Sequence, residues 1–93
     1  MYWIEASGVA AIASDNLAVE AVGKEVSVNS RGSNLPIHDL CLFRLGIHLG
    51  ELWHLAELAK WLKKHQRNRF LLTAPPLRLT GAVGSPVTPI ATV

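Results

Sequence analysis

The sequence predicts an α/β fold of short strands and two main helices. Apolar runs of a few residues, bounded by glycine or by small polar residues, are typical of short buried strands. A later segment instead repeats apolar residues at i, i+3, i+4 and i+7, as a helix face does: Leu55, Leu58, Ala59 and Leu62. Because 93 residues suit one small domain, residues 1–93 are treated as a single unit.

The first third is predicted to contain a helix end, a strand and a loop. Residues 1–6 read as the last turns of a helix that stops at Gly8, since glycine readily adopts the left-handed conformation. Residues 9–14 read as a buried strand followed by the polar turn Ser14-Asp15-Asn16, at the strand end where α/β proteins tend to bind ligands. Residues 29–34 are a loop by composition.

The remaining elements follow from glycine and proline positions. A mostly apolar helix is predicted from His38 to Gly46, then a short strand over 47–49 and the leucine-rich helix after Glu51. Strands are predicted over three further ranges: 70–73, 77–80 and 89–93. The second of these is placed at a sheet edge, because Pro75-Pro76 before it cannot donate to a ladder.

Composition narrows the set of partners. Hydrophobic residues make up 49% of the chain and charged residues 17%, so we expect apolar surface that a second copy or a missing part of the same fold covers. A homo-oligomer is therefore expected. A net charge of +2, without a basic face interleaved with aromatic residues, argues against a nucleic-acid partner.

The single cysteine, Cys41, predicts a reducing environment. It excludes a disulfide within the chain and lies in an apolar stretch, where it is expected to be a small core residue. The N-terminal residues lack a basic leader, and the apolar run at 9–13 is too short to cross a bilayer. We therefore expect a cytoplasmic protein without a membrane partner.

His38 and Glu51 are the candidate metal ligands. Imidazole nitrogen and carboxylate oxygen together suit Zn²⁺ or Mn²⁺, and the helix, glycine and strand between these residues can turn both side chains towards one cavity. The spacing alone equally fits an exposed Glu and a hydrogen-bonded His.

Other constellations are weaker. The spacing of Glu51 and His54 also occurs in carboxylate-bridged di-iron bundles, but those need further helices that carry Glu. Alternation along the predicted strand turns His48 away from its apolar neighbours, towards the surface or a supporting role. Ser85 lacks the glycine pattern of a nucleophile elbow and reads as a loop residue.

Several motifs in order resemble the C-terminal part of the kynurenine formamidase-like cyclase family. That family shows a His opening an apolar helix, a Gly eight residues later, and a Glu five residues past the Gly; here these are His38, Gly46 and Glu51. Three more segments match in the same order: Ser14-Asp15-Asn16, Phe70-Leu71-Leu72 before Pro76-Leu77, and Gly84-Ser85-Pro86 before Pro89-Ile90-Ala91.

The resemblance implies the C-terminal part of a swivelling β/β/α cyclase-like fold and a metal-dependent hydrolase. In that reading His38 and Glu51 bind a divalent metal, Zn or Mn, and metal-activated water cleaves a small-molecule amide, formamide or ester. Asp15 and Asn16 would line the substrate pocket, although Asp and Asn after a strand are also ordinary turn residues.

One departure from the family bears on activity. The family's N-terminal motif, His-x-Gly-Thr-His-x-Asp, supplies most metal ligands and the general base, and it does not occur in this sequence. No catalytic residue is therefore assigned within the chain, and the chain alone is expected to be inactive. The alternative is a non-catalytic module that self-associates or binds a partner.

Overall fold

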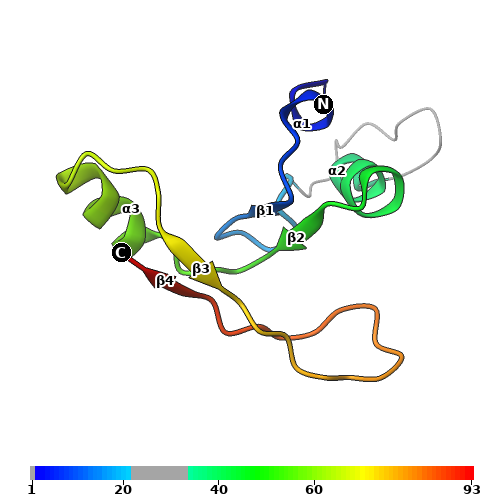
Figure 1. Cartoon of the computed structure of the whole chain (residues 1–93). Helices are drawn as coiled ribbons and strands as arrows, with labels where there is room; N and C mark the ends of the chain where they lie inside the picture. The colour runs from blue at the N-terminus through cyan, green and yellow to red at the C-terminus, as the bar shows by residue number, and fades with distance from the viewer. Residues whose placement is uncertain (1, 22–33) are drawn as a thin grey trace. The chain divides into compact units, whose positions relative to one another are not determined.

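The computed structural model describes residues 2–21 and 34–93. Contacts divide the chain into two compact units, Met1–His54 and Leu55–Val93, and each is described by itself. Both units combine helices with short strands, so the predicted α/β class is confirmed in this general form (Figure 1). The expectation of a single domain stays a prediction.

The first unit begins as the sequence predicts. Helix α1 spans Tyr2–Ser7, and Gly8 follows with a φ of +69°, the left-handed conformation expected of a helix stop. Strand β1, Ala11–Ala13, confirms the predicted strand in a shorter form. Its residues are half-buried or exposed rather than buried, because in the described part of the chain β1 has one strand neighbour.

That neighbour is strand β2, His48–Gly50, which runs parallel to β1. Ala11 pairs with His48 and Ala13 pairs with Gly50, so the carboxyl ends of the two strands lie side by side (Figure 1). The sequence predicted this strand over 47–49, one residue earlier than the structure has it. Parallel pairing needs a long crossover between the strands, and here the crossover carries the helical segment.

The helical segment has two parts. Helix α2, Pro36–His38, continues directly into η1, Asp39–Leu45, which is a π-helix. Gly46 ends it with a φ of +66° and donates its N–H to the carbonyl of Cys41. The predicted helix and its glycine stop are thus confirmed, whereas the π-type winding was not predicted. π-Helical turns are rare and occur frequently at functional sites.

A small core lies beneath this segment. Cys41 is completely buried, which confirms its prediction as a core residue. Burial raises the pKa of its thiol, so the thiolate is disfavoured. The other buried apolar residues of the described ranges come from the turn after β1, from η1 and from the position directly before β2: Ala18, Leu40 and Ile47.

The second unit contains a helix and a β-hairpin. Helix α3, Ala56–Lys64, matches the predicted leucine-rich helix. Strands β3, Leu71–Thr73, and β4, Ile90–Thr92, pair antiparallel, which confirms two of the predicted strands (Figure 1). The ring of Trp61 on α3 stacks on His65, with ring centroids 4.0 Å apart.

The predicted strand over 77–80 is wrong. Where the two arms beyond the hairpin ladder approach, the structure has only an isolated bridge between Pro76 and Val87. Proline lacks the N–H that a continuous ladder needs, so pairing does not extend through Pro75-Pro76. The predicted loop at 29–34 lies outside the described residues except for Asn34, which forms a bend.

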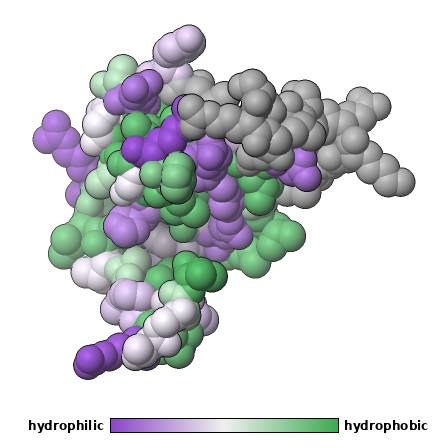
Figure 2. Space-filling view, turned by 90° about the vertical axis from the view of Figure 1, so that its right-hand side faces the viewer, coloured by the Kyte–Doolittle hydropathy of each residue, from purple (hydrophilic) through white to green (hydrophobic). Residues whose placement is uncertain are grey.

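Large apolar side chains lie on the surface of both units. Figure 2 shows hydrophobic residues exposed beside hydrophilic ones. Tyr2 is 90% exposed and Phe43 is 82% exposed. The expected partner surface stays a prediction, because the structure holds one chain. In the ranges that the structure describes, every helix is too short or too polar to cross a membrane.

Candidate metal centre

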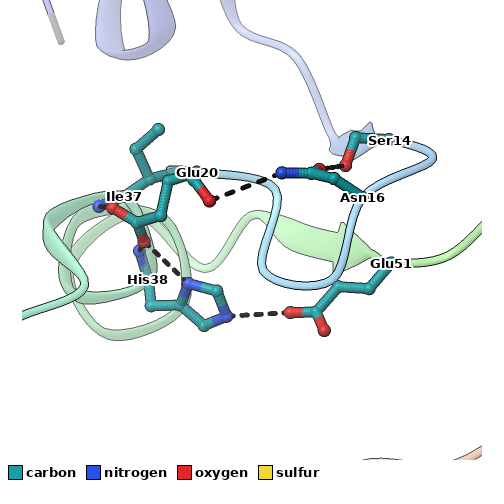
Figure 3. A network of polar contacts seen from close by, with 6 residues as sticks. All are labelled: Ser14, Asn16, Glu20, Ile37, His38 and Glu51. Atoms are coloured by element: carbon teal, nitrogen blue, oxygen red, sulfur yellow. Dashed lines mark hydrogen bonds and ion pairs between the residues drawn. The ribbon is translucent and has the colours of Figure 1, made fainter. Parts of the chain in front are cut away.

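The imidazole of His38 lies between two carboxylates. Its Nδ1 is 2.9 Å from Oε1 of Glu20, and its Nε2 is 3.0 Å from Oε1 of Glu51 (Figure 3). The two carboxylates approach opposite edges of the ring. The structure therefore brings together the two residues that the sequence singled out, and adds a third that it did not.

Glu20 is fixed by the start of the helical segment. Its Oε2 accepts the N–H of Ile37 at 2.9 Å, and its Oε1 accepts the N–H of His38 at 3.1 Å. The first N–H groups of a helix have no partner within the helix, and a carboxylate there satisfies them and opposes the helix dipole. Glu20 is the one buried charged residue of the described ranges, at 7% exposure.

The mutual contacts shift two pKa values. Burial alone would raise the pKa of Glu20, but the N–H of Ile37 and the imidazole of His38 together hold it below its ordinary value. Burial would likewise lower the pKa of His38, but hydrogen bonds to Glu20 and Glu51 outweigh it and raise that pKa. Without a metal ion, His38 therefore holds its second proton to higher pH than a free histidine.

The loop after β2 positions Glu51. The backbone N–H of Leu52 donates to the carbonyl of Asn16, and the N–H of Trp53 donates to the carbonyl of Ser14. The loops after β1 and β2 are thus joined just beyond the sheet. Gly50 permits this arrangement, because a Cβ there would lie 2.8 Å from the indole ring of Trp53.

Asp15 and Asn16 have different surroundings. The side-chain amide of Asn16 donates to the carbonyl of Glu20 at 3.4 Å, and its oxygen accepts the hydroxyl of Ser14 (Figure 3). Asn16 thus braces the turn that leads to Glu20. Asp15 is exposed and takes no part in the network drawn in Figure 3. Their role in a substrate pocket stays a prediction.

The donors fit part of a metal site. Nε2 of His38 and Oε1 of Glu51 are a nitrogen and an oxygen 3.0 Å apart, both from side chains that are mostly buried. The other ring nitrogen of His38 contacts a carboxylate, one of the partners, with backbone carbonyls and water, that metal-ligating histidines almost always have. Within residues 2–21 and 34–93, however, no group of three or more His, Cys, Asp or Glu could hold an ion.

The weaker candidates are placed elsewhere. His48 is exposed on β2, as alternation along the strand predicted. Glu51 makes its hydrogen bond with His38, and His54 is exposed. Sequence reasoning missed Glu20. The available signal was one acidic residue amid the apolar stretch from Leu17 to Val22, where a charge is costly unless it is paired.

A hydrogen-bonded histidine and carboxylate at the carboxyl ends of two parallel strands is an arrangement suited to a ligand site of an α/β protein. Nearly the whole chain is similar to part of a crystal structure described as that of a novel cyclase. The two are 41% identical with a TM-score of 0.83, over 99% of this chain and 28% of that one. The similarity supports a cyclase-like chain that spans little more than a quarter of its neighbour's length. No family model and no curated protein matches the chain.

Proposed function

We propose that this chain is the C-terminal part of a metal-dependent amidohydrolase of the kynurenine formamidase-like cyclase family. The observation that carries the proposal is the approach of His38 Nε2 to Glu51 Oε1 at the carboxyl ends of β1 and β2. The similarity of nearly the whole chain to part of a cyclase supports it. The substrate would be a small-molecule amide, formamide or ester.

In this proposal, His38 contributes its Nε2 and Glu51 contributes a carboxylate oxygen to a Zn²⁺ or Mn²⁺ ion. Such an ion supplies a Lewis acid that polarises a carbonyl and lowers the pKa of a water molecule. The side chain of Glu51 is 34% exposed, so its carboxylate is accessible to an ion from solvent. His38 is held more tightly, since both its backbone and its ring contact Glu20.

Two donors do not make a catalytic metal site. Catalytic zinc sites ordinarily have three protein ligands and an open position, and hydrolysis also needs a placed general base. In this proposal, a segment outside this sequence that carries the family's His-x-Gly-Thr-His-x-Asp motif would supply these groups. We therefore expect residues 1–93 alone to bind divalent metal weakly and to have no hydrolase activity.

Two measurements test the proposal. Hydrolysis of an aryl formamide, a cyclic amide and an ester is assayed with Zn²⁺ or Mn²⁺ added. The rate of hydrolysis with the chain present should not exceed the rate with the metal ion alone. Turnover that disappears in His38→Ala would contradict the expected inactivity. The genomic reading frame upstream of Met1 is also examined. A continuous frame that encodes His-x-Gly-Thr-His-x-Asp supports the proposal, and a start site without such a motif argues for the alternative.

The alternative is a non-catalytic module that self-associates or binds a partner. The exposure of large apolar side chains favours it, with Tyr2 and Phe43 the clearest cases in the first unit. Size-exclusion chromatography with light scattering distinguishes a self-associated chain from a monomer. A stable dimer that Phe43→Ser disrupts supports self-association, whereas a monomer at high concentration argues against it.

A further inference from the structure

We propose that Glu20 is a positioning residue that fixes the ring of His38, so that Nδ1 carries the proton of the neutral imidazole and Nε2 is left to bind a metal ion. The consequence for metal binding rests on the proposed function. The assignment of the proton does not, because it concerns the metal-free chain.

The first argument is geometric. Both oxygens of Glu20 are held by backbone N–H groups, those of Ile37 and His38, at 2.9 Å and 3.1 Å. A carboxylate pinned at two points cannot follow the ring if the ring turns. The 2.9 Å contact from Oε1 to Nδ1 therefore selects one orientation of the imidazole, with Nε2 on the side of Glu51.

The second argument decides which carboxylate accepts the N–H of the neutral ring. The side chain of Glu20 is 5% exposed, whereas that of Glu51 is 34% exposed. Water can solvate Glu51 when it loses its hydrogen bond to the ring. Glu20 has little access to water, and a buried carboxylate that loses a hydrogen bond bears a larger cost. The neutral ring thus donates from Nδ1 to Glu20, and Nε2 remains an acceptor.

The third argument concerns the backbone conformation that positions Glu20. Val19, directly before it, has a φ of +59°, a conformation in which a β-branched residue is a marked outlier. The side chain of Asn16 donates to the carbonyl of Glu20 across the same turn. A strained turn that is braced in this way turns Glu20 inwards to the helix start, where it meets His38 (Figure 3).

Nitrogen-15 NMR of the histidine rings tests the proposal in the metal-free chain. Spectra are recorded at increasing pH until the His38 signals no longer change, so that the ring is neutral although its pKa is raised above the ordinary value of 6.5. The two ring nitrogens then report which of them carries the proton. In the unmodified chain, His38 should be protonated at Nδ1. Protonation at Nε2 would overturn the proposal without recourse to any variant.

Two variants sharpen the test. Glu20→Gln removes the pinned carboxylate and should give a mixture of both tautomers at His38. Glu51→Gln is the matched control, since it changes the other carboxylate beside the same ring and should leave the proton on Nδ1. A Glu20→Gln chain that keeps the fold by circular dichroism and also keeps the Nδ1 proton would contradict the inference.

Metal affinity separates this inference from the proposed function. Titration with Zn²⁺ alone should show binding weakened about 10- to 100-fold in Glu20→Gln, the range for groups that orient a ligand. If the tautomer depends on Glu20 but Zn²⁺ does not bind, Glu20 positions His38 and the proposed function fails. If Zn²⁺ binds through His38 and Glu51 with equal affinity in Glu20→Gln, the proposed function stands and the role of Glu20 in metal binding is refuted.

Discussion

Nε2 of His38 lies 3.0 Å from Oε1 of Glu51, although the first residue belongs to the helical crossover and the second follows strand β2. The parallel pairing of β1 and β2 accounts for the approach. It places the turn that leads from β1 to Glu20 next to the loop that carries Glu51, and the crossover returns His38 between them.

Removing either carboxylate should lower the pKa of His38. Each carboxylate stabilises the imidazolium form, and the contact with Glu20 contributes more than that with Glu51. NMR titration of the His38 ring should therefore give the highest pKa in the unmodified chain, a lower pKa in Glu51→Gln and the lowest in Glu20→Gln. Glu5→Gln changes an exposed carboxylate of the same unit that makes neither of these contacts, so it is the control and should leave the pKa of His38 unchanged. An unchanged pKa in both variants of the site would show that the contacts do not form in solution.

The stability of the metal-free chain should depend on pH in two directions. The pKa of His38 is raised above 6.5, so its contribution is full below pH 6.5 and is lost as pH rises through the raised value. The pKa of Glu20 is lowered below 4.5, so its contribution is present above pH 4.5 and is lost as pH falls through the lowered value.

Both contributions are present between pH 4.5 and pH 6.5, so scanning calorimetry should show the highest melting temperature in that range. His38→Ala should flatten the alkaline side of the profile. A profile of the same shape in His38→Ala would mean that other groups govern the dependence on pH.

Gly50→Ala should destabilise the chain by about 1–3 kcal/mol, the usual cost of overpacking. The added methyl would lie 2.8 Å from the ring of Trp53, which would have to move and disturb the loop that carries Glu51. Gly84→Ala is a matched control, because a Cβ at that glycine meets no atom within 4 Å. Urea denaturation measures both. Equal stability of the two variants would show that the indole shifts without cost.

Local signals in the sequence predicted the elements that depend on local chemistry. Gly8 and Gly46 end helices with positive φ, and the spacing of Leu55, Leu58 and Leu62 identified α3. The π-helical winding of η1 was not predictable, because the same apolar pattern fits an α-helix. The strand predicted over 77–80 does not form, because the two prolines before it lack the N–H groups that would continue the ladder.

The site was predictable only in part. The pairing of His38 with Glu51 was anticipated from resemblance to a family, since spacing alone equally fitted a histidine without metal. Glu20 was not anticipated, because its partners lie 17 and 18 residues along the chain, across a segment with no local pattern that links them. Contacts of this kind depend on the crossover, which sequence periodicity does not specify.

The central claim is that His38 and Glu51 together bind a divalent metal ion. Paramagnetic broadening of the histidine ring signals by substoichiometric Mn²⁺ tests it most directly, because the method detects weak sites and identifies the residue. The account predicts that the His38 signals broaden first, that the exposed His65 is little affected, and that Glu51→Gln removes the difference. Equal broadening of His38 and His65, or selective broadening of His38 that persists in Glu51→Gln, would contradict it.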